Sequence, residues 1–237
     1  MNLEITSLGD HALVVSLADR VESAAARRVQ VACEWLASAA LPGVTELVPA
    51  ATTVTLFYSP TELLAAGGPA MDLAGWLAVR VRERLATLPK GSASRPARLV
   101  EVPVCYGGEF GPDLEAVAAR VKLSAKEVIA RHSETEYFVL QLGFSPGFPY
   151  LHGLPAELAV PRRDTPRTVV PAGSVAIANG QSGIYPIATP GGWNLIGRTP
   201  LRLFRPDQQP PTLLQPGDRV KFRVISLAEF ERWEAAQ

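Results

Sequence analysis

The sequence predicts an α+β protein with two domains, an N-terminal α/β sandwich and a C-terminal all-β domain. Three observations carry this prediction. Residues 1–88 alternate between strand-like and helix-like patterns of apolar residues. Residues 89–97 are small and polar and contain two prolines, which is typical of a linker. Residues 98–237 include a stretch, 143–217, whose 13 prolines and 10 glycines are too many for helices.

The N-terminal domain, residues 1–88, is predicted to be a ferredoxin-like sandwich. Residues 11–17 alternate as a strand, and residues 20–39 place their apolar side chains on one face of a helix. Residues 44–48 and 53–58 then form a strand pair, and residues 69–88 form a second helix. A final strand would complete the split βαβ arrangement. Its apolar sheet has no obvious cover, so a second copy of the chain is among the partners that we consider.

The C-terminal domain, residues 98–237, is predicted to be a β-barrel or sandwich. A strand over residues 99–104 is followed by short helices at 112–121 and 124–133. Ser124 and Glu127 have the spacing of a capping box, in which each side chain binds the other residue's backbone. After Tyr137 no helical period returns until the last dozen residues, and short strands alternate with turn residues.

Composition excludes several classes of function. The 237 residues carry a formal net charge of zero, so nothing indicates binding to nucleic acid or to a membrane surface. The apolar runs are shorter than the roughly 20 residues that span a bilayer, and the N-terminus lacks the pattern of a signal peptide. With two cysteines, Cys33 and Cys105, the sequence predicts a cytoplasmic protein in a reducing compartment.

Arginine is concentrated in one part of the chain. Between residues 161 and 205 there are six arginines and one acid, Asp164, with no lysine or histidine. The planar guanidinium group suits bidentate binding of a carboxylate or phosphate. Solvated arginines on strand edges are an equally good interpretation. The six are Arg162, Arg163, Arg167, Arg198, Arg202 and Arg205.

Glycine- and proline-rich segments supply the other candidates for ligand binding. In residues 143–155 we expect Phe144 and Phe148 in the core and Tyr150 at the site. Residues 181–185 offer an amide, a hydroxyl and a phenol, which suit an amide-bearing small molecule, although turn formation explains them equally. The candidates for substrate contact are Tyr150, Gly173, Ser174, Ser182, Gly192 and Trp193.

The sequence contains no recognisable nucleophile motif. There is no Gly-x-Ser-x-Gly, no cluster of histidine and cysteine, and no P-loop. A serine-hydrolase triad and a zinc site are therefore disfavoured, and we expect no metal ligands on this chain.

Several long blocks resemble the KipI-like family, which is also described as the 5-oxoprolinase B subunit, allophanate hydrolase subunit 1, or carboxyltransferase domain subdomain C and D. The blocks are residues 8–13, 102–114, 132–134, 143–155, 162–167, 170–177, 181–186 and 190–200. The match covers nearly the whole chain in the right order. Ser182 stands where family members often have threonine, and the hydroxyl group is kept.

The resemblance implies a small N-terminal α/β domain and a cyclophilin-like β-barrel. It also implies membership of an ATP-dependent complex that converts 5-oxo-L-proline to L-glutamate. The implied partners are a second barrel-type protein, the KipA-like 5-oxoprolinase C subunit, and a third protein, the 5-oxoprolinase A subunit. The implied cofactors are ATP and Mg²⁺, bound mainly with the partner, and no biotin attachment is expected on this chain.

Such a reaction needs positioning and charge neutralisation more than a nucleophile, because phosphorylation of the lactam oxygen would make the ring reactive. The residues expected to act in catalysis are Arg162, Arg167, Gln181, Tyr185 and Arg198. The alternatives are an inhibitor of a sensor histidine kinase, which some family members are described as, or a component of a urea- or allophanate-related enzyme. Prolyl isomerase activity would rest on fold analogy alone, which is a weak argument.

Overall fold

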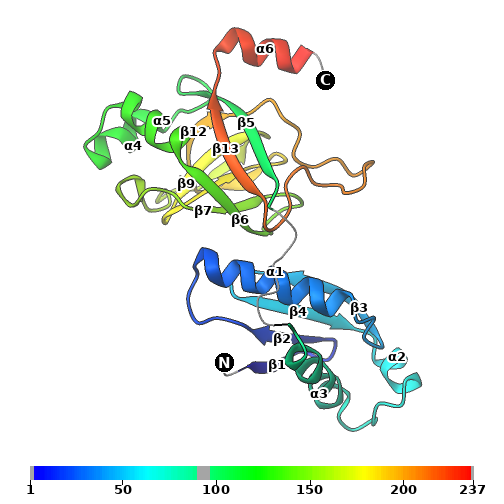
Figure 1. Ribbon diagram of the computed structural model, residues 1–237. Coiled ribbons are helices and arrows are strands. Elements are labelled where there is room, and N and C mark those ends of the chain that lie inside the picture. The colour runs from blue at the N-terminus through cyan, green and yellow to red at the C-terminus, as the bar shows by residue number, and fades with distance from the viewer. Residues whose placement is uncertain (1–2, 90–96, 236–237) are drawn as a thin grey trace. The chain divides into compact units, whose positions relative to one another are not determined.

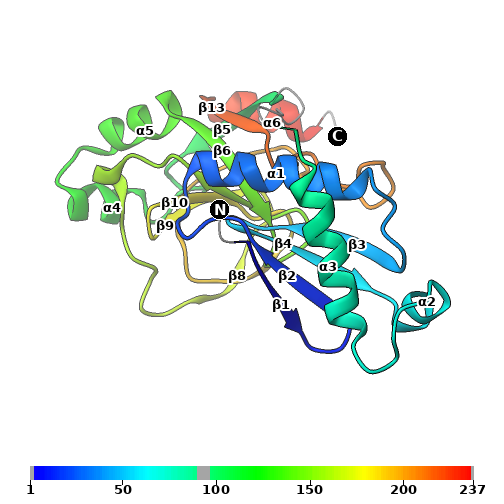
Figure 2. The same cartoon turned by 60° about the horizontal axis from the view of Figure 1, so that its bottom comes forward.

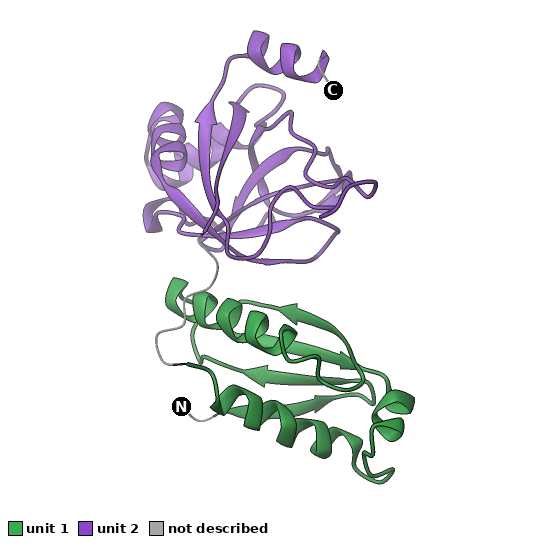
Figure 3. Ribbon diagram, turned by 45° about the vertical axis from the view of Figure 1, so that its right-hand side comes forward, with its two compact units in different colours: residues 1–96 green, residues 97–237 purple. Residues whose placement is uncertain are grey.

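The computed structural model describes residues 3–89 and 97–235 and divides into two compact units, residues 1–96 and 97–237 (Figure 3). The predicted linker, 89–97, lies mostly outside the described residues. The first unit contains β1 (Glu4–Leu8), β2 (Ala12–Ser16), α1 (Ser23–Ala37), β3 (Val44–Pro49), β4 (Thr53–Tyr58), α2 (Pro60–Ala65) and α3 (Leu73–Ala86). Helices α1 and α3 lie on the same face of its sheet (Figure 2).

The sheet of the first unit has the strand order β1-β2-β4-β3, and every neighbouring pair is antiparallel. The expectation that a final strand follows the second helix is wrong. Strand β1, which precedes the predicted elements, takes the edge place beside β2 that this final strand would fill. The sandwich is thus completed from the N-terminal side, and its pairing of strands is otherwise the predicted one.

Alternation along the strands builds the core of this unit. Leu13 and Val15 on β2, and Val54 and Leu56 on β4, point toward the helices and are buried. Apolar side chains of α1 and α3 meet them from the helical layer. Burying branched aliphatic side chains between a sheet and two helices is the main stabilising contribution for such a layer. The helical side chains concerned are Val29, Leu36, Leu77 and Val81.

The second unit contains seven strands that form a closed barrel in the order β10-β7-β6-β13-β5-β12-β9 (Figure 1). Its elements are β5 (Leu99–Tyr106), α4 (Leu114–Val121), α5 (Ala125–Glu134), β6 (Glu136–Leu142), β7 (Pro149–His152), the 3₁₀ turn Ala156–Leu158, β8 (Arg167–Val170), β9 (Ser174–Ala178), β10 (Gln181–Ile184), β11 (Thr189–Gly191), β12 (Asn194–Arg198), β13 (Arg219–Val224) and α6 (Leu227–Ala235). Strands β8 and β11 pair separately.

The closed barrel confirms the predicted β-barrel fold of this part of the chain. The capping box predicted from the sequence is also present at the start of α5, because Ser124 accepts a hydrogen bond from the backbone N–H of Glu127 while Glu127 binds the backbone of Ser124. The pair β5 and β13 is parallel, whereas the other barrel pairs are antiparallel. Val117 of α4 and Val128 of α5 join the interior cluster of the barrel.

A bulge in β12 shapes the surface that matters for function. The register of β12 against β9 shifts between Leu195 and Gly197. The loop before α4 fills the gap, since the backbone N–H of Gly107 donates to the Ile196 carbonyl at 3.1 Å and the backbone N–H of Asp113 donates to the Leu195 carbonyl at 3.0 Å. This loop is therefore fixed against the barrel and brings Asp113 to the bulge.

Candidate functional site

An aromatic cluster lies on the outer face of the barrel over β7, β9 and β10. We use this name for Phe144, Phe148, Tyr150, Tyr185 and Trp193, whose rings meet edge to face at centroid distances of 5.1–6.1 Å. The strands beneath carry small residues at the outward positions. At Gly183 an added Cβ would lie 2.7 Å from the Phe148 ring, so only glycine leaves room for it. Small residues on the strands thus make room for large rings outside the barrel wall, where Phe148, Tyr185 and Trp193 are buried against one another and Phe144 is exposed.

Polar groups gather around the Tyr185 hydroxyl at the edge of this cluster. The backbone N–H of Trp193 donates a hydrogen bond to its oxygen. Burial raises the pKa of Tyr185, although that hydrogen bond and the charges of Arg162 and Arg167 act to lower it, and Tyr150 adds to the rise. The phenol is therefore neutral at physiological pH, and the two guanidinium groups are its neighbours.

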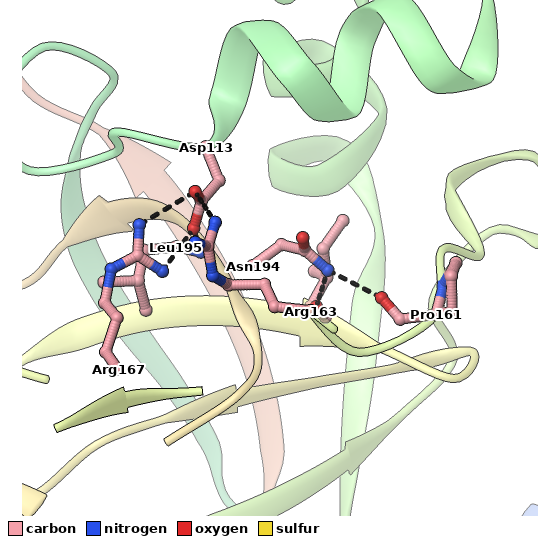
Figure 4. A network of polar contacts seen from close by, with 7 residues as sticks. Asp113, Pro161, Arg163, Arg167, Asn194 and Leu195 are labelled. Atoms are coloured by element: carbon pink, nitrogen blue, oxygen red, sulfur yellow. Dashed lines mark hydrogen bonds and ion pairs between the residues drawn. The ribbon is translucent and has the colours of Figure 1, made fainter. Parts of the chain in front are cut away.

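A buried carboxylate holds the loop that carries these arginines. Arg167 makes two hydrogen bonds of 2.8 Å to the oxygens of Asp113, and Arg163 makes a third of 2.7 Å (Figure 4). The backbone N–H of Leu195 donates a fourth, also 2.7 Å. Asn194 fixes the start of the same loop by donating to the Pro161 carbonyl at 2.8 Å. The loop 161–167 is therefore anchored from both ends.

The charge state of Asp113 follows from these contacts. Burial acts to raise its pKa, but the hydrogen bonds from Arg167 and Leu195, together with the charges of Arg167 and Arg163, outweigh it. The net effect is a pKa below the usual range for aspartate. Asp113 is ionised at neutral pH and neutralises one of its two arginines.

Arg162 differs from its neighbours because it is exposed and makes no hydrogen bond or ion pair with any of the described residues. It lines a hollow of about 320 Å³ together with Arg120 and Arg163. The acid in that hollow is Asp164. The Nε atom of Arg163 is buried there with no hydrogen-bond partner in the described part of the chain. The hollow is therefore positively charged and suited to an anion.

The structure brings some of the predicted site residues together. Gly192 lies next to Pro166, beside the aromatic cluster. Gln181 is half-buried at the start of β10, on the same outward-facing side as Gly183. Few of these side chains are free for a ligand, because Arg167 is paired with Asp113 and Tyr185 is 1% exposed. The predicted residues that meet at the cluster are Tyr150, Tyr185 and Trp193, and Arg167 is joined to it through Gly191, whereas Arg162 lines the separate hollow.

Other predicted residues lie elsewhere. Gly173, Ser174 and Arg198 are at the opposite end of β9 and β12 from the 161–167 loop. Arg198 and the loop thus cannot share one small ligand, since four residues of strand, about 13 Å, separate Asn194 from Arg198. Ser174 is 2% exposed and its backbone pairs with β12.

The assignment of Ser182 to a ligand contact does not agree with its position. Its hydroxyl is fully buried inside the barrel, 2.9 Å from Nε2 of His132, and it donates to the Ala176 carbonyl at 3.3 Å. The other ring nitrogen, Nδ1, is 2.8 Å from the Tyr106 hydroxyl. Burial lowers the pKa of His132 to about 3, so the ring is neutral. Ser182 is part of the core rather than the surface.

The expectation for Phe144 is wrong as well. Its side chain is 62% exposed, and its backbone has a φ of +67°. The turn 143–148 needs a left-handed residue at this position, which lifts the ring out of the core and over Tyr185. Phe148 lies in the core as expected.

Sequence reasoning missed Asp113. It lies 50 and 54 residues before the arginines that it binds. The available signal was its place at the end of the block 102–114, one of the blocks that carry the family resemblance.

Within residues 3–89 and 97–235 no group of three or more histidine, cysteine, aspartate or glutamate side chains could hold a metal ion. No helix in that part of the chain combines the length and apolar character needed to cross a membrane. Both cysteines are half-buried and free.

A comparison of the sequence with known protein families identifies the class to which this two-unit chain belongs. The sequence matches the model of the carboxyltransferase domain, subdomain C and D, over residues 3–214, and the chain belongs to this family. Its curated relatives include the 5-oxoprolinase B subunit of Bacillus subtilis (strain 168), 44% identical over 232 residues, which are 98% of this chain and 96% of the relative. The protein of the same name from Escherichia coli O157:H7 is 44% identical over 215 residues, 91% of this chain and 93% of the relative.

Solved structures show the same fold. TTHA0988 has a TM-score of 0.76 at 38% identity over 91% of this chain, but this chain covers 40% of TTHA0988. PH0987 from Pyrococcus horikoshii has a TM-score of 0.55 at 39% identity, over 96% of this chain and all of PH0987. The K. lactis urea amidolyase has a TM-score of 0.77 at 16% identity over 97% of this chain and 15% of the amidolyase, which shows the shared fold alone.

Proposed function

We propose that this chain is part of an ATP-dependent 5-oxoprolinase, which opens 5-oxo-L-proline to L-glutamate. Similarity along nearly the whole chain to two bacterial proteins named as the B subunit of 5-oxoprolinase supports the proposal. The structural observation that carries it is the unpaired guanidinium of Arg162 in a positively charged hollow of the barrel domain. The proposed partners are the KipA-like C subunit and the A subunit of the same enzyme.

The lactam carbonyl is a poor electrophile because the ring nitrogen shares its lone pair with it. Transfer of the γ-phosphoryl group of ATP to the lactam oxygen releases ADP and makes the ring carbon reactive. A first water then adds to this carbon and the carbon–nitrogen bond breaks, which frees the amino group and leaves an acyl phosphate. A second water hydrolyses the acyl phosphate to L-glutamate and inorganic phosphate. The protein's task is to position the reactants and neutralise their charge.

The described residues suit that task. Arg162 would bind an anionic oxygen of the phosphate or of the substrate carboxylate. The half-buried Tyr150 offers a phenol and, with Trp193, an apolar wall for a five-membered ring. Tyr185 and Arg167 would act indirectly, because one is buried against Trp193 and the other is bound to Asp113.

The residues present do not fit a magnesium ion held by this chain alone. Mg²⁺ prefers several oxygen ligands, and Asp164 is the one carboxylate that lines the hollow of Arg162. We propose that Mg²⁺ and most of the nucleotide are held with the partner protein, and no step is assigned to the ion on this chain.

The test is a reconstituted assay of glutamate formation from 5-oxo-L-proline. The chain is combined with the two partner proteins, with and without ATP. We expect ATP-dependent glutamate formation, and none when this chain is left out. Full activity without this chain would refute the proposal. Turnover of urea but not of 5-oxo-L-proline would reassign the substrate.

A further inference from the structure

A second hollow, of about 640 Å³, lies at the other end of β12 from the 161–167 loop. This volume is in the range of pockets that bind small molecules. All residues that line the hollow belong to the barrel domain. They include Gly173, Ile187, Arg198, Arg202, Phe204 and Glu234.

Arg198 is held in a fixed orientation in this hollow. Its Nε donates to the Ala172 carbonyl at 2.9 Å. Its guanidinium carbon lies 5.8 Å from the ring centre of Phe110 and 5.9 Å from that of Phe230. The two terminal nitrogens have no partner among the described residues. A guanidinium ordered in this way loses little freedom when it binds a carboxylate.

Two further charged side chains line the hollow without partners. Arg202 is exposed and makes no hydrogen bond or ion pair with the described residues. The same holds for Glu234, which reaches the hollow from α6. The lining therefore offers two positive charges and one negative charge, and no ion pair between them satisfies any of the three.

One wall of the hollow is closely packed backbone, and another is formed by apolar side chains. At Gly173 φ is +81°, and an added Cβ would lie 2.3 Å from the Thr199 carbonyl oxygen. The two backbones are joined by a 2.9 Å hydrogen bond from Thr199 to Gly173. Ile187 and Phe204 supply apolar contact area. These apolar side chains suit a ligand that has a short hydrocarbon chain between charged groups.

We propose that this hollow binds an acidic α-amino acid. Its two carboxylates would pair with Arg198 and Arg202, and its ammonium group with Glu234. The two negative charges and one positive charge of the ligand would then each face a charge of opposite sign in the lining. The choice of L-glutamate as the amino acid rests on the proposed function, in which glutamate is the product. The hollow is separate from the site proposed for the lactam. Its occupancy would therefore rise with the concentration of the product without blocking the lactam site.

Isothermal titration calorimetry on the purified chain tests this inference. The probes are L-glutamate, glutarate, which lacks the ammonium group, and inorganic phosphate. We expect saturable binding of L-glutamate and weakening of at least about tenfold in Arg202→Ala, because a charge-assisted contact is lost. Glu234→Gln is expected to weaken binding of L-glutamate but not of glutarate. Arg232→Ala, on the same helix but outside the hollow, is the control.

Absence of saturable glutamate binding would overturn the inference, as would equal affinity in Arg202→Ala and the unaltered chain. Binding of phosphate in preference to glutamate would show an anion site without amino-acid selectivity, and this also overturns it. The titration needs no partner and no turnover. Failure of the turnover assay with glutamate binding intact would therefore refute the proposed function and leave the hollow as an amino-acid site.

Discussion

At the scale of single residues, Asp113 explains why an arginine-rich loop is ordered in a protein with no net charge. Its side chain is 6% exposed and accepts from two guanidinium groups and one backbone N–H. Two of the six clustered arginines therefore have a structural role, because they hold the loop through Asp113. Arg162, which precedes both of them in the chain, is left free for a ligand.

Removal of the charge on Asp113 should destabilise the barrel. Asp113→Asn leaves Arg163 and Arg167 without their counter-ion, and loss of one member of a buried pair costs about 3 kcal/mol. Urea denaturation followed by fluorescence measures this change. Glu157→Gln breaks an exposed ion pair with Arg131 and is the control, with little change expected. Equal stability of the two variants would show that the Asp113 network contributes nothing.

At the scale of secondary-structure elements, strand β11 ties the arginine loop to the aromatic cluster. Gly191 pairs with Arg167 of β8. An added Cβ at Gly191 would lie 2.4 Å from the Tyr185 hydroxyl oxygen. Gly192 next to it is different, because a Cβ there would meet Pro166 at an ordinary 3.5 Å. Two adjacent glycines thus make a matched pair for a test.

Gly191→Ala should displace Tyr185 and loosen the cluster, whereas Gly192→Ala should be tolerated. Overpacking of a buried site costs about 1–3 kcal/mol. Near-ultraviolet circular dichroism reports the packing of the aromatic rings, and a urea titration gives the free energy of unfolding. If both variants matched the unaltered chain in both measurements, the close contact between β11 and Tyr185 would be disproved.

At the scale of the whole molecule, the buried His132 makes stability depend on pH. Its pKa is about 3 in the folded protein, against an ordinary value of 6.5. Between these values the unfolded chain binds a proton that the folded protein does not, so stability falls as pH falls. The slope is about 1.4 kcal/mol per pH unit, or about 2 kcal/mol between pH 6.5 and pH 5.

The free energy of unfolding, measured in urea at pH 7, 6 and 5, checks this dependence. His132→Gln should remove this part of the slope, and His152→Gln, at a half-buried histidine, should retain it. Asp113 adds an acid-sensitive contribution at lower pH, because its lowered pKa makes its stabilisation disappear only below about pH 4. A slope between pH 6.5 and pH 5 that is unchanged in His132→Gln would contradict the assignment.

Much of the fold could be predicted because its signals are local. Helix periodicity, strand alternation and the Ser124–Glu127 capping box lie within short windows of sequence, and all of them hold in the structure. Strand β1 was missed because it is an exposed edge strand with almost no buried side chain, so it shows no alternation. Its place beside β2 is a property of the sheet rather than of its own five residues.

The site could be predicted only in part. Arginine clustering and the Gly/Pro-rich segments drew attention to the part of the chain that holds the candidate site, but pairing at a distance of 50 residues cannot be read from a single sequence. Ser182 is a different case. It lies two residues before the buried Ile184 on β10, so strand alternation alone would have placed both inside the barrel.

We propose that Arg162 and the aromatic cluster both belong to the active site of a 5-oxoprolinase complex. Turnover by the reconstituted complex containing Arg162→Ala tests it most directly, with Lys126→Ala, an exposed lysine of α5, as the control for loss of a charge. We expect kcat/KM for 5-oxo-L-proline to fall by about 10²–10³, as for loss of one charge-stabilising group, with partial rescue in Arg162→Lys. An Arg162→Ala complex with the kcat and KM of the unaltered enzyme would show that Arg162 is not part of the active site.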